Sequence, residues 1–479
     1  MALLKTAVRL QNSLKTAEKN RSTIDLERIV ARIRGIVGPE NVLTDEAELV
    51  CYSYDASLYS NLPDVVVFPG SDVEVSEILR LANEEHVPVT PRGSGTSLSG
   101  GPVPVDAGIV IVLSRMNRIL DFDIENLTVT CEVGITLKDL NRFLSRWRLF
   151  FPIDPGSAET VTLGGMIGEN AAGMHSLKYG KTRDRVLDLE VVLPTGKIVS
   201  LGSRCYKCAS GYDFKDLFIG SEGTLGVVTK ATLKISPIPE HYDVVSAAFK
   251  STSDAGRAIS EIVRREIPVS ALEFMDEYSI NVVRSFTGLP LPDAAAMVLV
   301  ECQGLKEAIQ GHLERIVEIL NGEGAFEVKI SKTRQEADQL WYARKVAYGA
   351  ITRRHPTAIQ ADPVVPVSRL PDYLARLDSI SKKYSVQIIS YGHAGDGNLH
   401  PTVMVDERNM DEMDRARQAL AEIYRSALEL GGTLTGEHGI GVAKSEYFRW
   451  EWAESYVDLA RGVKTVLDPN NIMNPGKWI

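Results

Sequence analysis

Two histidines stand seven residues apart in the stretch YGHAGDGNLHP, residues 391–401, with small and turn-forming residues between them. The flanks VQIISYGH and LHPTVMV are rich in strand-forming residues, and AGDGN has the composition of a hairpin loop. We therefore expect His393 and His400 to lie close together across a strand pair. A lone histidine is usually structural, whereas two neighbouring imidazoles recur in metal sites.

A second glycine-rich loop, GTLTGEHGIG at residues 432–441, carries the adjacent pair Glu437 and His438. From the residues alone, His393, His400 and Glu437 suit a divalent metal with one coordination position open for a substrate. This ligand set does not decide between zinc, iron and manganese. The competing interpretation is two turns with incidental polar residues. The remaining histidines lack such surroundings: His86, His175, His241, His312 and His355.

A glycine- and hydroxyl-rich loop, PRGSGTSLSGG at residues 91–101, follows the predicted strand PVT. Glycines let backbone N–H groups approach an anion, so this loop could cradle a pyrophosphate. Its spacing matches neither GxGxxG nor the P-loop, and a plain surface loop is an equal alternative for this stretch alone. Three further clusters, at 154–157, 163–180 and 220–229, favour the walls of one extended ligand, because ordinary turns do not require so many glycines.

The elements that must position these loops fall into two groups. Residues 64–240 read as a β-α-β alternation, a helix ITLKDLNRFLSRW and a hairpin turning at Pro194, Thr195 and Gly196. From residue 241, longer helices alternate with spaced strands, which predicts an antiparallel sheet backed by helices. The expected fold class is α+β. We place an N-terminal helical segment at 1–40, a first domain at 41–240, a second at 241–430, and a closing segment at 431–479 that returns to the first domain.

Composition excludes several classes of protein. The 479 residues carry a formal charge of −10, whereas a nucleic-acid binder needs a basic face. No apolar run is long enough for a transmembrane segment and no signal peptide is evident, so we expect a cytoplasmic location, with peripheral membrane association through a partner left open. Residues 1–24, basic with apolar positions at helical spacing, are interpreted as a docking helix, a targeting segment or a frayed end.

Five cysteines in so long a chain predict reduced thiols rather than a disulfide framework. Cys205 and Cys208 form one CxxC pair, which a redox or metal site could use. A second pair is missing, so a loop with two ordinary thiols is favoured.

In order and spacing, PRGSGTSLSGG, PIDPGS, TLGGMIGENAAGMHSLKYG and LFIGSEGTLGVVT resemble the FAD-binding domain of the vanillyl-alcohol-oxidase flavoprotein superfamily. The FAD-linked D-2-hydroxyacid dehydrogenases, of the D-lactate dehydrogenase and glycolate oxidase subunit type, are the branch it resembles most. The resemblance covers residues 40–479 and implies a two-subdomain FAD-binding domain with a substrate cap domain. It places Arg92, Gly93, Ser94, Gly95, Thr96 and Ser97 at the FAD pyrophosphate.

The same resemblance extends the flavin contacts along the chain. The ribityl and isoalloxazine region would be lined by Pro155, Gly156, Ser157, Gly164, Gly165, Asn170, Gly173, Tyr179 and Gly180. The adenine end would face Glu222, Gly223, Gly226 and Val227, and Asn474 is a further cofactor contact. Some members attach FAD covalently through a histidine of the first loop. That loop has none here, so non-covalent FAD is expected.

The second half resembles the GHxGDGNxH and GEHGxG motifs of the same family. This resemblance implies that His393, His400 and Glu437 bind a metal and that His438 is the active-site base. Arg344 matches the arginine that binds the substrate carboxylate, a role that suits the guanidinium fork. From the residues alone, Arg344 would be a solvated position on a helix face.

The implied reaction is oxidation of a 2-hydroxy acid at C2, with proton removal by His438 and hydride transfer to flavin N5.

One departure from the family bears on the substrate. Gln360 stands where members selective for 2-hydroxyglutarate place a lysine, and Ala361 and Pro363 flank Asp362. Lactate or glycolate is therefore the expected substrate, and a 2-hydroxyglutarate-type dehydrogenase is the alternative.

Electrons must leave the reduced flavin, yet the chain has no ferredoxin-type cysteine run. We therefore expect a partner, either an iron–sulfur subunit or an electron-transfer flavoprotein, with quinone or a soluble acceptor as alternatives.

A different class of protein, a flavin-free metallohydrolase built on His393, His400 and Glu437, would be distinguished by its lack of visible colour.

Overall fold

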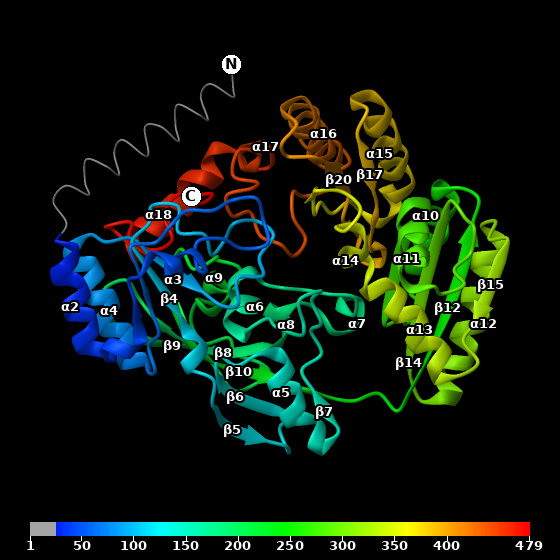
Figure 1. Ribbon diagram of the computed structural model, residues 1–479. Helices are drawn as coiled ribbons and strands as arrows, with labels where there is room; N and C mark the ends of the chain where they lie inside the picture. The colour runs from blue at the N-terminus through cyan, green and yellow to red at the C-terminus, as the bar shows by residue number, and fades with distance from the viewer. Residues whose placement is uncertain (1–24) are drawn as a thin grey trace.

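The computed structural model describes residues 25–479, which form two halves that face each other across the molecule (Figure 1). The chain passes from the first half to the second in an extended stretch near residues 236–241. The expectations for residues 1–24 lie outside the described residues. The rest of the N-terminal segment forms α2 (Leu26–Val37), which Asp25 caps.

A parallel arrangement occupies the N-terminal part of the first half. Its sheet runs in the order β1 (Val42–Leu43), β2 (Val65–Val67), β4 (Ile109–Val112) and β3 (Val89–Arg92). Strands β2, β4 and β3 are parallel, and α4 (Asp72–Glu85) makes the crossover after its cap at Ser71. This confirms the β-α-β alternation and places the loop after Arg92 at the end of a buried strand.

An antiparallel sheet completes the first half. Its order is β5 (Ile119–Asp123), β6 (Thr128–Glu132), β10 (Val227–Lys234), β8 (Val186–Val192) and β9 (Ile198–Gly202). The predicted hairpin joins β8 to β9, and Gly196 takes the positive φ of +79° that its turn requires. The longer helices here are α5 (Leu137–Leu144) and α6 (Leu163–Glu169).

Short elements connect these sheets. They are α3 (Glu46–Val50), α7 (Ser176–Tyr179), α8 (Thr182–Arg185), α9 (Lys215–Phe218), the pair β7 (Leu149–Phe150) and β11 (Ser236–Pro237), and the 3₁₀ turns η1 (Pro39–Asn41), η2 (Leu113–Arg115) and η3 (Ser145–Trp147).

The second half is built on a six-stranded antiparallel sheet. Its order is β15 (Glu327–Ile330), β12 (His241–Phe249), β14 (Ala296–Gly304), β13 (Ala271–Asp276), β18 (Tyr391–His393) and β19 (Asn398–Leu399). One core contains Val298 and Val300 of β14, and a second core contains the alternate residues Met297 and Leu299. The prediction of a sheet backed by helices is confirmed, and the helices cover both faces.

Each face of this sheet has its own set of helices. The first core is shared with α10 (Thr252–Arg264), α12 (Lys306–Gly322) and α15 (Leu370–Tyr384), which follows η4 (Val367–Arg369). The second core is shared with α11 (Glu277–Thr287), α13 (Arg334–Lys345) and α14 (Ala347–Ile351). Arg344 therefore lies in the last turn of α13, on the face of the sheet that carries the second core.

The two strands that flank the histidine loop are divided between two sheets. Strands β17 (Gln387–Ile389) and β20 (Thr402–Val405) belong, with β16 (Thr357–Gln360), to a separate three-stranded sheet, whereas β18 and β19 belong to the six-stranded sheet. The predicted strand pair is present in one antiparallel register: Gln387–Ile389 pair with Thr402–Met404, and Gly392 and His393 pair with Leu399 and Asn398. The pairing is interrupted at Ser390, where the chain passes from one sheet to the other. The Ser390 N–H donates to Asp276 Oδ2 at 2.5 Å instead of continuing the ladder.

The closing segment contacts both halves. After α16 (Met410–Glu429), the chain forms α17 (Phe448–Glu451) and α18 (Glu454–Leu467). Tyr447 and Phe448 join the first core of the second half, whereas Ile472 and Met473 join the core of the first half. Met473 also bridges Val89 of β3, so this segment helps to hold the two halves together.

Candidate active site

A cavity of about 1240 Å³ lies between the two halves, and residues of both halves line it. From the first half come the loop after β3, the turn at 154–157 and the start of α6. From the second half come Arg344, His393 and His400, and the closing segment adds Glu437 and His438. The glycine-rich and histidine-rich motifs, which are remote in sequence, therefore open into one space.

Close backbone packing forms the first-half wall. Ser94 Oγ donates to the Thr160 carbonyl at 2.5 Å, which ties the loop after β3 to the 154–165 segment. A Cβ at Gly93 would overlap the Thr162 hydroxyl, so glycine is needed at this approach. Of the predicted cofactor residues, the cavity is lined by Arg92, Gly93, Ser94, Gly95, Thr96, Ser97, Pro155, Gly156, Ser157, Gly164, Gly165, Glu222, Gly223, Gly226 and Val227.

Arg92 provides a test of whether an anionic cofactor fits this wall. Its side chain is only 7% exposed, and its Nη1 has no hydrogen-bond partner among residues 25–479. Burial lowers the pKa of Arg92, against the raising effect of the Asp55 charge. A buried guanidinium with one nitrogen left without a hydrogen-bond partner among these residues, at the edge of a glycine-rich cavity, fits a diphosphate, which would accept a hydrogen bond from it.

Five predicted cofactor residues lie outside the cavity lining: Asn170, Gly173, Tyr179, Gly180 and Asn474. Asn170 Oδ1 accepts the Arg183 N–H at 3.0 Å, and Tyr179 donates to Gln303 Oε1 at 2.8 Å. Asn474 Nδ2 donates to the carbonyls of Gly101 and Glu222 at 2.9 and 2.6 Å. These three side chains therefore hydrogen-bond within the protein, and their predicted contacts with the cofactor stay predictions.

Glu222 lines the cavity, but its carboxylate is engaged with the closing segment. Its two oxygens accept the N–H groups of Ile440 and Gly441 at 2.8 and 2.7 Å. Burial raises the pKa of Glu222, and these backbone hydrogen bonds oppose that effect. Its side chain thus fixes the GIG stretch next to His438.

The two histidines of the hairpin lie close together, as predicted. His393 of β18 is the register partner of Asn398 in β19, and the chain between them turns through η5 (Ala394–Asp396) and Gly397, whose φ is +76°. The ring centroids of His393 and His400 are 5.1 Å apart, and both side chains are buried.

Glu437 completes a three-residue cluster with these histidines. Its Oε1 lies 3.2 Å from His393 Nε2 and 3.3 Å from His400 Nε2, so one carboxylate oxygen and two imidazole nitrogens converge. Burial alone would raise the pKa of Glu437, but the neighbouring His393 lowers it below its usual range. Two imidazoles and a carboxylate are a donor set that suits zinc, iron or manganese.

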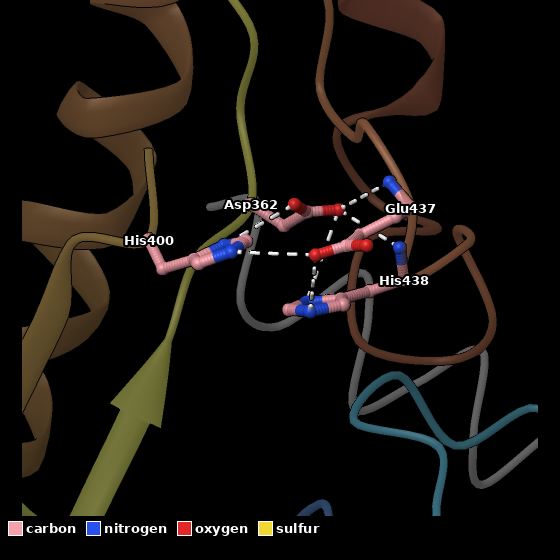
Figure 2. A group of neighbouring side chains, drawn as sticks. All are labelled: Asp362, His400, Glu437 and His438. Atoms are coloured by element: carbon pink, nitrogen blue, oxygen red, sulfur yellow. Dashed lines mark hydrogen bonds and ion pairs between the residues drawn. The ribbon is translucent and has the colours of Figure 1, made fainter. Parts of the chain in front are cut away.

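The buried residue Asp362 holds the loop that carries Glu437 and His438 (Figure 2). Its Oδ2 accepts the Thr435 hydroxyl at 2.6 Å and the N–H groups of Gly436, Glu437 and His438 at 3.0, 3.0 and 2.9 Å. Its Oδ1 accepts Asn398 Nδ2 at 2.9 Å. The sequence analysis missed this role of Asp362.

A second grouping of possible metal ligands includes Asp362, His400, Glu437 and His438, whose donor atoms lie within 4.8 Å of one another. Both carboxylate oxygens of Asp362 already accept hydrogen bonds, as described above. We therefore assign Asp362 to the support of the loop and retain His393, His400 and Glu437 as the candidate ligands.

His438 stacks against His400, with ring centroids 5.2 Å apart and an interplanar angle of 14°. Burial lowers the pKa of His438 to about 4, although the charge of Asp362 opposes this. The imidazole is therefore neutral at pH 7 and able to accept a proton.

Arg344 is 6% exposed, which corrects its interpretation from the residues alone as a solvated helix position. Its Nε donates to Glu273 Oε2 at 2.7 Å, and its guanidinium lies 5.0 Å from the centre of the Tyr391 ring. Glu273 also contacts His393 Nδ1 through Oε1 at 2.8 Å. Sequence reasoning missed Glu273, although an acidic residue within the apolar strand ALEFMD was a visible signal.

His175 also departs from expectation. Its Nδ1 lies 2.7 Å from Asp154 Oδ2 and its Nε2 lies 3.0 Å from Glu301 Oε1, so it connects the 154–157 turn of the first half to β14 of the second. The sequence analysis had assigned this histidine no special surroundings.

Cys205 and Cys208 are exposed free thiols in the loop after β9. Between residues 25 and 479, none of the helices has the length and apolar character needed to cross a bilayer.

Comparison with known proteins shows which family these features belong to. The family described as "FAD linked oxidases, C-terminal domain" matches residues 238–478, and the FAD binding domain matches residues 63–202. The chain is 42% identical to glycolate oxidase subunit GlcD of Bacillus subtilis (strain 168) over 444 residues, covering 92% of this chain and 94% of the relative. It is 37% identical to a D-lactate dehydrogenase of Archaeoglobus fulgidus, covering 87% and 91%.

Solved structures agree on the fold. p-Cresol methylhydroxylase with substrate bound superposes with a TM-score of 0.80 at 16% identity, covering 94% of this chain and 96% of that one. A 4-ethylphenol oxidase from Gulosibacter chungangensis superposes with a TM-score of 0.78 at 18% identity, with the same coverage. The α+β fold of the vanillyl-alcohol-oxidase type is thereby confirmed.

Proposed function

From the premise that this chain belongs to the FAD-linked oxidase family, as a FAD-linked D-2-hydroxyacid dehydrogenase, we propose that it oxidises D-lactate or glycolate to the 2-oxo acid. The observation that carries this proposal is the shared cavity. One wall carries a buried arginine with a guanidinium nitrogen that is free within the described part of the chain, which suits a dinucleotide. It faces a cluster of arginine, histidines and glutamate, which suits a small hydroxy acid. The two relatives named above are called a glycolate oxidase subunit and a D-lactate dehydrogenase, and these names support this substrate class.

In the proposed site, Arg344 binds the substrate carboxylate. Its Nε is used by Glu273, which leaves the two terminal amino groups for a carboxylate in the cavity. A guanidinium fork can pair both oxygens of a carboxylate, which also orients C2 of the substrate. Gln360 lines the same cavity and donates to the Tyr391 hydroxyl at 2.5 Å. An uncharged group at this position favours a monocarboxylate over 2-hydroxyglutarate.

His438 is the proposed base. Its neutral, half-buried imidazole stands beside the candidate metal ligands and can accept the proton of the C2 hydroxyl. Non-covalent FAD supplies the hydride acceptor when bound, and a divalent ion held by His393, His400 and Glu437 would polarise the substrate oxygen.

A partner protein is the proposed destination of the electrons. A relative is named as a subunit of glycolate oxidase, and another, from Arabidopsis thaliana, is named D-lactate dehydrogenase [cytochrome]. We propose an iron–sulfur subunit or an electron-transfer flavoprotein as the acceptor for this chain, in the cytoplasm or at the membrane surface through that partner.

The experiment is anaerobic mixing of the purified protein with D-lactate, L-lactate, glycolate and D-2-hydroxyglutarate, with the visible flavin band as the readout. Bleaching by D-lactate or glycolate that is lost after chelation and restored by zinc or manganese is the expected result. Bleaching by D-2-hydroxyglutarate alone would overturn the proposed substrate class. Bleaching that chelation leaves unchanged would overturn the proposed role of the metal. A protein that neither contains FAD nor binds it would contradict the whole proposal.

A further inference from the structure

The carboxylate of Glu273 contacts two groups of the candidate site at once. Oε1 lies 2.8 Å from His393 Nδ1, and Oε2 accepts the Arg344 Nε–H at 2.7 Å. Its side chain is 1% exposed, in the middle of β13, where the neighbouring positions are apolar. An acidic residue at such a position is costly unless both oxygens are paired, so its presence calls for a specific use.

We infer that Glu273 is a positioning residue that orients two arms of the site together, the histidine that faces the metal position and the arginine that faces the substrate carboxylate. This inference rests on the proposed function, because it takes His393 as a ligand and Arg344 as the carboxylate-binding group. Glu273 is not in the cavity lining and would not touch the substrate itself.

The histidine arm follows from the tautomers of imidazole. A carboxylate at Nδ1 can only accept, so His393 must carry a proton on Nδ1, and in the neutral ring Nε2 then has the lone pair that a metal can bind. Nε2 is the atom that points to Glu437, at 3.2 Å. Glu273 therefore selects the tautomer of His393 that can bind a metal through Nε2.

The arginine arm follows from the geometry of guanidinium. Among residues 25–479, the Arg344 side chain makes one hydrogen bond, from Nε to Glu273. That bond fixes the plane of the guanidinium, and the Tyr391 ring 5.0 Å away limits its tilt. The two terminal amino groups are thus held in one orientation toward the cavity, which reduces the entropy lost on binding a carboxylate.

Replacement of Glu273 by glutamine separates the two arms. An amide offers one accepting oxygen and one donating NH₂, and Arg344 Nε–H can only donate, so the amide oxygen must face Arg344. The NH₂ then faces His393 Nδ1, which must accept, and the proton of a neutral His393 moves to Nε2. Glu273→Gln should therefore lose the metal arm and keep the arginine arm, whereas Glu273→Leu should lose both.

The test uses the FAD-loaded protein with two probes. Zinc affinity is measured by competition with a fluorescent chelator, and pyruvate affinity is measured on the metal-free protein through the flavin visible spectrum. For E273Q we expect zinc affinity to fall about 10- to 100-fold while pyruvate affinity changes less than about 3-fold. E273L should weaken both. Glu301→Gln is the matched control, since Glu301 is a buried carboxylate on the adjacent strand that pairs with His175, away from the candidate ligands.

The outcomes separate the inference from the proposed function. A wild-type protein that binds neither zinc nor pyruvate would overturn the proposed function, and the inference with it. A wild-type protein that binds both, with E273Q unchanged in zinc affinity, would overturn the inference alone. A variant-independent check is ¹⁵N-histidine NMR of the zinc-loaded protein, in which His393 should be protonated at Nδ1; coordination through Nδ1 would contradict the inference even if E273Q failed to fold.

Discussion

The backbone N–H of His438 donates to Asp362 Oδ2 at 2.9 Å, and this oxygen is the same one that accepts the N–H groups of Gly436 and Glu437. One buried carboxylate therefore sets the conformation of the loop that carries the proposed base and a candidate metal ligand. The arrangement is an anion enclosed by successive backbone amides, with the anion supplied by the protein.

Asp362→Asn is expected to reduce turnover about 100-fold, because a small displacement of His438 is costly in catalysis. If the amide oxygen replaces Oδ2, the amide NH₂ faces Asn398 Nδ2, which is also a donor. Asn398 cannot rotate freely, since its Nδ2 also donates to the Pro363 carbonyl at 3.1 Å. Turnover, FAD content and Tm should be measured together. Turnover within about 3-fold of wild type would show that the loop does not depend on this charge.

Arg344→Lys tests the carboxylate arm. A lysine keeps the charge but loses the planar fork and the Nε–H that Glu273 accepts. We expect kcat/KM to fall about 10- to 100-fold, corresponding to a charged hydrogen bond of about 1.5–3 kcal/mol, with FAD content unchanged. Arg334→Lys, at the exposed start of the same helix, is the control. Equal kcat/KM in R344K and wild type would remove Arg344 from substrate binding.

Arg92→Met tests the diphosphate position. The unpartnered Nη1 should pair with an anionic oxygen in the FAD-bound protein, so its loss should weaken FAD binding about 10- to 100-fold, the equivalent of about 1.5–3 kcal/mol. The dissociation constant can be measured by flavin fluorescence during reconstitution of the FAD-free protein. Arg115→Met is the control, because Arg115 is more exposed and donates to the Phe68 carbonyl outside the cavity. Similar FAD affinities for R92M and R115M would contradict this assignment.

Local patterns predicted the parts of this site that a few neighbouring residues determine. The hairpin between His393 and His400 is such a part, because its turn residues and strand flanks are contiguous. The glycine-rich loop after β3 is another, since its composition already indicates close backbone approach. The resemblance to a known family then supplied the connection between these two motifs, which no local pattern contains.

The supporting residues could not be predicted in the same way, because their partners are remote in sequence. Glu273 and His393 are 120 residues apart, and Asp362 and His438 are 76 apart. Arg344 looked exposed because it lies in a charged helix, and only the packing of α13 against the six-stranded sheet buries it. Tyr179 and Asn474, predicted as cofactor contacts, hydrogen-bond to parts of the protein that are remote in sequence.

His175 provides a prediction about pH. Burial alone would lower its pKa, but the charge of Asp154 and the hydrogen bonds to Asp154 and Glu301 outweigh burial and raise the pKa of His175 to about 10. In the unfolded chain the pKa is about 6.5. Because the folded pKa is the higher one, protonated His175 stabilises the folded protein fully below pH 6.5. This contribution decreases as the pH rises and is lost above about pH 10.

His175→Gln should therefore destabilise the protein most at acidic pH. Removal of one partner from a fully buried ion pair costs about 3–5 kcal/mol, and loss of the half-buried His175 should cost less, so we expect a smaller but measurable reduction in Tm at pH 6. The difference in Tm between H175Q and wild type should shrink steadily between pH 6.5 and pH 10, because the wild-type imidazole loses its proton over this range. His312→Gln, on α12, controls for the loss of a histidine elsewhere. A difference that stays constant across this pH range would show that His175 connects the two halves as a neutral hydrogen-bonding group.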